Sequence, residues 1–133
     1  MAPRKFSRHM NLQLLLKEYQ TLPEFEGMIL NSVNQKGHFS STPLHIAIYR
    51  SSLDQVDTLL AATADPNVRG EYGERPLQVA VACGNTEIVE RLIRAGARLE
   101  LTDDDGMDTW MLSEGFGFTE QLKEIVKRVT SES

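Results

Sequence analysis

The hydrophobic residues of this chain recur at the spacing of one face of an α-helix. The clearest example is the run 87–95, which carries apolar side chains at positions i, i+1, i+4 and i+5: Ile88, Val89, Leu92 and Ile93. Gly96 follows directly, as a helix-terminating glycine does, and Asn85 or Thr86 can cap the other end. The pattern predicts a short amphipathic helix over this run.

The pattern belongs to a unit that occurs twice along the chain. The stretch Thr42-Pro43-Leu44-His45-Ile46-Ala47 recurs further along as Arg75-Pro76-Leu77-Gln78-Val79-Ala80. The register then holds through the rest of each copy, as the alignment of Val56 with Val89 shows. The proline of each stretch suits the first turn of a helix, where its missing N–H has no intrahelical partner. Each copy is therefore predicted to open with a helix.

A 33-residue period with a T-P-L-H-x-A signature resembles the ankyrin repeat, and residues 73–97 are close to the ankyrin pattern at most framework positions. The resemblance implies an all-α fold, an ankyrin repeat solenoid of about four helix-turn-helix repeats with short hairpin-like loops. Each repeat is then a pair of short helices that buries its apolar face against its neighbours. The resemblance also gives His45 a structural role, bonded to backbone groups of the neighbouring loop, and Gln78 can donate and accept at the equivalent place.

We expect one domain over residues 1–133, with clear repeats at 37–69 and 70–102. The flanking segments are expected to be degenerate cap repeats, 9–36 at the N-terminal end and 103–133 at the C-terminal end. End repeats of a solenoid are atypical because one of their faces meets water.

Each cap has its own helix signals. Leu12, Leu15, Leu16 and Tyr19 suggest one helix in the N-terminal cap. The capping-box pattern from Thr21 to Glu24, with apolar residues behind it, predicts a second. In the C-terminal cap, a final helix is predicted from about Thr119 to Thr130, and Trp110 is expected to seal the core.

The net charge and the short apolar segments limit the compartments and the kinds of partner that the sequence favours. The chain has 14 Lys and Arg against 19 Asp and Glu, a formal net charge of −5, which disfavours non-specific binding to nucleic acid. No segment approaches the roughly 18 apolar residues of a membrane span. Residues 1–9 carry basic side chains with no apolar core behind them, unlike a secretory signal. The single cysteine, Cys83, cannot form an intramolecular disulfide, so we expect a cytoplasmic protein.

The sequence offers no constellation for catalysis. The run from Asp103 to Gly106 suggests a calcium loop, but an EF-hand with Gly106 sixth would place Leu101 first and Leu112 twelfth, where ligands are needed. Three separated histidines and one cysteine lack the paired spacing of a zinc site, and no phosphate-binding glycine motif occurs. We therefore expect no enzyme activity, no metal and no cofactor.

The partner-facing positions of ankyrin-type binders lie on the loop fingers and at the exposed end of the first helix of each repeat. By alignment, the resemblance implies these protein-binding residues: Phe39, Tyr49, Arg50, Arg69, Glu71, Tyr72, Glu74, Asp104, Asp105, Met107 and Phe116. The set mixes acids with aromatic side chains, which interface cores favour. One departure concerns the first finger. The usual glycine two residues before Thr42 is Ser40, so the finger at 35–41 is expected to be rebuilt.

These features predict a non-enzymatic protein–protein interaction module that binds and blocks its partner. We expect that partner to be another protein with a basic surface, with no nucleic acid and no membrane involved, and a monomer when free. The preferred role is an immunity or antitoxin protein that neutralises a cognate toxin such as a nuclease, resembling small stand-alone ankyrin proteins encoded beside bacterial toxins. The alternative is a eukaryotic-type regulatory ankyrin adaptor or an inhibitor of a signalling protein.

Overall fold

A computed structural model describes the backbone of residues 3–132 and the side chains of residues 12–132. Residues 1 and 2 and the side chains of residues 3–9, which carry the expectation about a secretory signal, lie outside this description. The α-helices are α1 (Pro3–Gln20), α2 (Pro43–Tyr49), α3 (Leu53–Ala61), α4 (Pro76–Cys83), α5 (Thr86–Arg94), α6 (Thr109–Gly115) and α7 (Thr119–Ser131). Single 3-10 turns are η1 (Pro23–Phe25), η2 (His38–Ser40) and η3 (Glu71–Gly73). The described part of the chain contains no strand, which confirms the all-α prediction.

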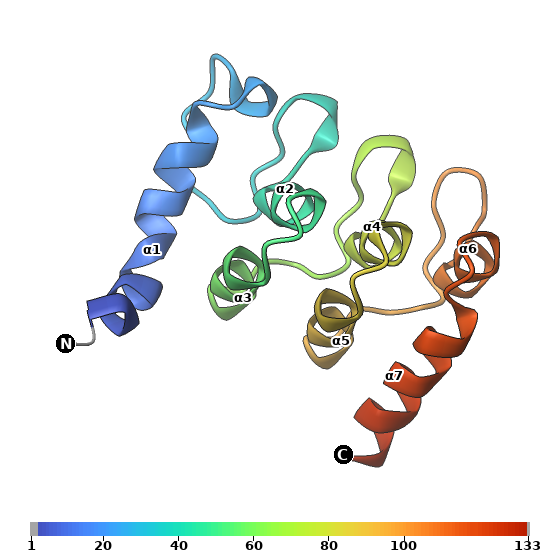
Figure 1. Ribbon diagram of the computed structural model, residues 1–133. Helices are drawn as coiled ribbons and strands as arrows, with labels where there is room; N and C mark the ends of the chain where they lie inside the picture. The colour runs from blue at the N-terminus through green and yellow to red at the C-terminus, as the bar shows by residue number, and fades with distance from the viewer. Residues whose placement is uncertain (1–2, 133) are drawn as a thin grey trace.

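The helices form pairs that stack side by side (Figure 1). Helices α2, α4 and α6 make one row, and α3, α5 and α7 make a second row beneath it. Helix α1 packs against α3 at the N-terminal end. The loops before the first row project on one side, and we call them finger 1 (residues 35–41), finger 2 (68–74) and finger 3 (101–107). This is the architecture of a helix-turn-helix solenoid.

The core repeats with the period of the sequence. Leu59, Leu92 and Ile125 occupy the same position of successive repeats, and each is at most 2% exposed. They come from the second-row helices α3, α5 and α7. In each helix pair, the same repeat position therefore supplies a buried apolar side chain to the core. Trp110 is partly buried and packs against this core, as predicted. Because each pair contributes equivalent apolar residues, its inner surface is buried only when its neighbours are present.

The helices begin where the sequence signals them. Pro43 and Pro76 occupy the first turns of α2 and α4. Asn85 caps α5 by accepting from the N–H of Ile88 at 3.1 Å. Arg75 has no acceptor with which to cap α4, and Oε1 of Gln78 instead accepts from the Arg75 N–H at 2.9 Å.

The second helix expected in the N-terminal cap does not form, and that prediction was wrong. The hydroxyl of Thr21 donates to the Glu18 carbonyl at 2.7 Å, so it closes the end of α1 and opens no new helix. Only the turn η1 follows, and Gly27 then adopts a left-handed backbone with φ of 81°. The ring of Phe25 is fully buried, and a Cβ at Gly37 would lie 2.8 Å from it.

Helix α1 is fixed through the end that precedes this turn. Tyr19 is fully buried, and its hydroxyl donates to Oε1 of Gln55 on α3 at 2.5 Å. Burial raises the pKa of Tyr19 to about 12, so it remains a donor. Arg50 lies over the Tyr19 ring, 4.8 Å from its centroid, and donates to Glu18 at 2.8 Å. Helix α1 thus covers the N-terminal edge of the array without a helical partner of its own.

Finger 1 keeps the shape of the other fingers, so the expectation that it is rebuilt was wrong. Ser40 has φ of 60°, close to the 75° of Gly73 and the 78° of Gly106 at the equivalent positions. The Gly37 N–H donates to the Ser41 carbonyl at 2.6 Å, as the Gly70 N–H donates to Glu74 at 2.7 Å. A serine therefore accepts the left-handed backbone that glycine adopts more readily.

Candidate partner-binding groove

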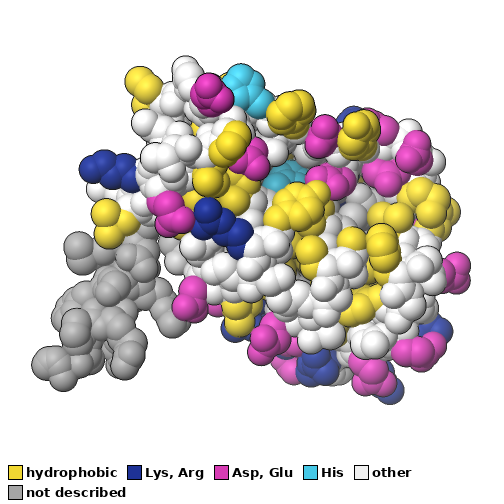
Figure 2. All heavy atoms as spheres, turned by 45° about the horizontal axis from the view of Figure 1, so that its top comes forward, with side chains coloured by type: hydrophobic (Ala, Val, Ile, Leu, Met, Phe, Trp, Pro, Cys, Tyr) yellow, Lys and Arg dark blue, Asp and Glu magenta, His cyan; other side chains and the backbone are white. Residues whose placement is uncertain are grey.

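A groove runs along the row of α2, α4 and α6 on the side where the fingers project. Figure 2 shows hydrophobic side chains among acidic ones on this face. The groove contains two hollows. The first hollow, about 500 Å³, lies between fingers 1 and 2 and the end of α2. The second hollow, about 250 Å³, lies between the ends of α2, α4 and α6.

Tyr49 and Glu74 line both hollows and separate them. The Tyr49 hydroxyl donates to Oε1 of Glu74 at 2.7 Å. Burial raises the pKa of both groups, and the nearby Glu71 carboxylate raises the pKa of Glu74 further. The bond therefore joins a neutral phenol to a carboxylate that is partly desolvated.

The floor of the groove comes from one repeat position. Ile46 lines the first hollow, and Val79 and Leu112 line the second. These three residues are each one repeat period apart, so each repeat places one apolar side chain in the groove. The sequence prediction missed them as site residues, although their shared register was the signal that could have found them.

The fingertips present aromatic side chains to solvent. Phe39 and Tyr72 occupy equivalent positions of fingers 1 and 2, with φ of 62° and 59° and exposed fractions of 70% and 78%. A left-handed backbone is uncommon for bulky residues. Both aromatics were predicted site residues. The structure places Phe39 at the first hollow and Tyr72 on the tip of finger 2.

Fingers 2 and 3 are bonded to each other. The Asp104 N–H donates to the Tyr72 carbonyl at 3.0 Å, and the Asp104 carboxylate pairs with Arg69. Gly73 permits this approach, since a Cβ there would lie 2.7 Å from the Asp104 nitrogen. Arg69 and Asp104 were both predicted to face a partner, and in the structure they pair with each other at the rim, where both side chains remain about half exposed.

The acidic run of finger 3 is partly structural. The Asp103 carboxylate accepts from the N–H groups of Asp105 and Met107, both at 2.9 Å, and so shapes the loop. Met107 is half-buried, and its carbonyl accepts from Gln78 at 2.8 Å. Of the predicted residues on this finger, Asp105 has the freest side chain. In the described part of the chain, no group of three or more Asp, Glu, His or Cys side chains is placed to hold a metal ion.

The remaining predicted residues divide between the two hollows. Arg50, Glu71 and Glu74 line the first, and Phe116 lines the second at 56% exposed. The N-terminal turn contributes a side that the prediction omitted, formed by Leu22, Pro23 and Glu24. That omission follows from the alignment, which covered the fingers and first helices of the later repeats and not the N-terminal segment.

His45 and Gln78 hold the fingers against the repeats that precede them. Nε2–H of His45 donates to the Glu74 carbonyl at 3.2 Å, and Nε2–H of Gln78 donates to the Met107 carbonyl at 2.8 Å. Burial lowers the pKa of His45, which favours its neutral form. The structural role predicted for His45 is confirmed, and its bond fixes the backbone at Glu74. Gln78 both donates and accepts at the equivalent place, as predicted.

Cys83 lies exposed in the second hollow. Partial burial and the charge of Glu74 raise the pKa of its thiol. A thiol is a much weaker nucleophile than a thiolate, so its surroundings do not activate it.

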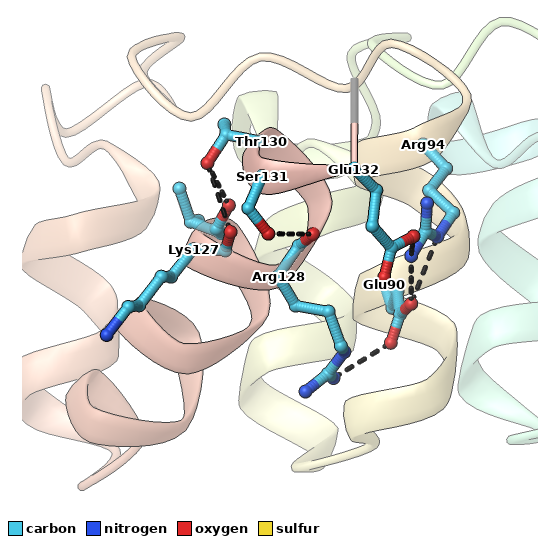
Figure 3. A network of polar contacts seen from close by, with 8 residues as sticks. Glu90, Arg94, Lys127, Arg128, Thr130, Ser131 and Glu132 are labelled. Atoms are coloured by element: carbon cyan, nitrogen blue, oxygen red, sulfur yellow. Dashed lines mark hydrogen bonds and ion pairs between the residues drawn. The ribbon is translucent and has the colours of Figure 1, made fainter.

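The opposite face carries a network of ion pairs between α5 and α7 (Figure 3). Glu90 accepts from Arg94 at 2.7 Å and from Arg128 at 2.9 Å, and Arg94 also pairs with Glu132. Hydrogen bonds from Arg128 and Arg94 lower the pKa of Glu90. Glu90, Arg94, Arg128 and Glu132 therefore neutralise one another within the protein.

The family model for ankyrin repeats (three copies) matches residues 8–103, more than half of the chain, and the protein belongs to the ankyrin repeat family. The match ends before α6 and α7, which continue the same stacking. Ankyrin repeats indicate a protein–protein interaction module, and proteins of this family are typically non-enzymatic. No curated protein matches the chain. None of the described helices has the length and apolar character required to span a membrane.

Proposed function

We propose that the protein binds a partner with a basic surface through the groove and the fingers, and blocks that surface. The observation that carries this proposal is the composition of the first hollow. Glu24, Glu71 and Glu74 lie along it, and none of them forms an ion pair with another described residue. Exposed aromatics next to unmatched acids suit a partner that brings cations and apolar contacts together.

We propose further that this partner is a cognate bacterial toxin, such as a nuclease, and that the protein is its immunity factor. A toxin that acts on nucleic acid needs a basic surface, and a groove with unmatched acids suits that surface. The net charge of −5 favours fast association with such a partner. Occlusion of the basic surface would prevent substrate from reaching it.

Capture from the native host tests both proposals. Wild-type protein, Glu71→Lys, Tyr72→Ala and Glu124→Lys serve as baits, the last being a matched charge reversal on α7. A basic protein captured by wild type and Glu124→Lys, and lost with Glu71→Lys, supports binding through the groove. Capture that survives Glu71→Lys and Tyr72→Ala contradicts it.

Co-expression then tests the immunity role. The captured partner should be toxic alone and harmless when expressed together with this protein. A partner that is not toxic contradicts the immunity role and favours the regulatory adaptor.

A further inference from the structure

The first hollow is lined by more acidic than basic side chains. Its lining contains three carboxylates, from Glu24, Glu71 and Glu74, and one basic residue, Arg50. Arg50 is already held by Glu18 at 2.8 Å. Among the described residues that line the hollow, none therefore supplies a cation that is free to enter it.

Aromatic rings accompany these carboxylates. Tyr49 donates to Oε1 of Glu74, which leaves Oε2 of the same group open to a ligand, since no described residue donates to it. Phe39, 70% exposed, lines the same hollow from finger 1. The position thus combines carboxylate acceptors with ring surfaces at an open site.

Among its described residues, the protein uses the same combination within its own fold. The guanidinium of Arg50 lies 4.8 Å from the Tyr19 ring centroid and donates to the Glu18 carboxylate at 2.8 Å. A cation–π contact and a charge-assisted hydrogen bond act there on one group. The first hollow offers both kinds of partner, and the one guanidinium in its lining, that of Arg50, is already held by Glu18.

We propose that the first hollow is a pocket for an arginine side chain of the partner, bound by the Glu71 and Glu74 carboxylates and the rings of Phe39 and Tyr49. The inference rests on the proposed function, because it names the anchor that the basic partner would supply. Arginine suits the pocket better than lysine, since its planar fork can bond two carboxylates and stack on a ring. The volume, about 500 Å³, lies in the range of small-ligand sites.

The test uses blocked Gly-Arg-Gly and Gly-Lys-Gly peptides, titrated separately into the ¹⁵N-labelled protein at low salt. The expected amide shifts concentrate on Phe39, Tyr49, Glu71 and Glu74, with the arginine peptide binding several-fold tighter than the lysine peptide. Glu71→Gln and Glu74→Gln should each raise the dissociation constant about fivefold or more, through loss of a charge-assisted bond. Glu124→Gln, an exposed acid on α7, is the matched control and should leave it unchanged.

Three results would overturn the inference: no binding, equal binding of the two peptides, or shifts centred outside the first hollow. The thermal midpoint of each variant excludes unfolding as the cause of a loss. Glu74→Gln keeps an oxygen that can accept from Tyr49, so its fold should be retained.

The captured partner separates this inference from the proposed function. If Glu71→Gln and Glu74→Gln leave partner affinity intact while Tyr72→Ala and Phe116→Ala weaken it, the groove binds the partner but the arginine pocket is wrong. If all four changes leave affinity intact, the proposed function fails as well.

Discussion

Asn34 and Asn67, at the same position of successive repeats, make the same two hydrogen bonds to the connection that lies one repeat further along. Nδ2 of Asn34 donates to the Thr63 carbonyl at 3.3 Å, and its Oδ1 accepts from the Asp65 N–H at 2.7 Å. Nδ2 of Asn67 donates to Gly96 at 3.1 Å, and its Oδ1 accepts from Arg98 at 2.8 Å. Each amide side chain thus joins two neighbouring connections and fixes the spacing between repeats.

Replacement of either asparagine should loosen this spacing. Asn34→Ala, at an exposed position, and Asn67→Ala, at a partly exposed one, each remove two hydrogen bonds, so each should lower the free energy of unfolding by about 1–2 kcal/mol. Urea unfolding followed by circular dichroism measures the change. Asn31→Ala is the matched control, since no side-chain hydrogen bond of Asn31 joins it to the rest of the described chain. If Asn34→Ala and Asn67→Ala have the same free energy of unfolding as Asn31→Ala, these side-chain hydrogen bonds do not hold the repeats together.

His45 should make stability depend on pH. Its pKa is lowered in the folded state from 6.5, so the unfolded chain binds more protons below that pH. The resulting stability is complete above pH 6.5 and is lost as pH falls towards the folded-state pKa. His45→Gln, which copies the residue at position 78, should remain folded. It should also remove the dependence of the free energy of unfolding on pH that His45 contributes.

The comparison is made by urea unfolding between about pH 7.5 and pH 5. The raised pKa of Glu74 acts in the opposite direction, but Glu74 is present in both proteins and cancels in the difference. The lowered pKa of Glu90 acts only below its ordinary 4.5, outside the window. Identical slopes for wild type and His45→Gln would contradict the role given to burial of the imidazole.

Ser40→Gly should stabilise the protein. Ser40 has φ of 60°, a left-handed conformation that costs a non-glycine residue about 1–2 kcal/mol, and the larger unfolded-state entropy of glycine offsets part of the gain. The expected net gain is about 0.5–1 kcal/mol in the free energy of unfolding. Gly73→Ser is the reciprocal variant and should destabilise, because its Cβ would approach the Asp104 nitrogen to 2.7 Å. A loss of stability in Ser40→Gly would show that the serine makes a compensating contact.

The last helix pair should be as integral to the fold as the pairs before it. We propose that residues 103–133 cap the array, because Glu114 stands where the equivalent Ile48 and Val81 are buried. Ile125→Ala and Leu92→Ala should then each cost about 2–5 kcal/mol as large-to-small core changes. Differential scanning calorimetry should show one cooperative transition in both variants. Loss of α7 in a separate, earlier transition would contradict the cap.

The extent of the sequence prediction follows from the repeat itself. Helices α2 to α5 were predictable because Pro43 and Pro76 mark their register and His45 and Gln78 make equivalent bonds. Before residue 37 the repeat signature is absent and could not guide the prediction. There the Thr21 hydroxyl donates to the Glu18 carbonyl at the end of α1 and does not cap a following helix. A local capping pattern cannot show which helix its hydroxyl will serve.

The positions of the candidate site residues could be predicted from the sequence, but the ion pairs among them could not. Alignment placed Phe39, Tyr49 and Phe116 along the groove, where the structure has them. It could not show that Arg69 and Asp104 pair with each other, because that contact depends on how closely fingers 2 and 3 approach. The unmatched acids are therefore fewer than the sequence alone suggested.

Kinetic binding to the captured partner tests the central claim, that the groove and fingers form the binding surface. Glu71→Lys should slow association, with added salt reproducing the effect on wild type, while Tyr72→Ala should accelerate dissociation and cost about 2 kcal/mol or more. Lys123→Glu and Lys127→Glu, on the exposed side of α7, should change neither rate by more than about twofold. Unchanged rates in both groove variants, together with lost binding in the α7 variants, would place the partner on the opposite face and contradict the account.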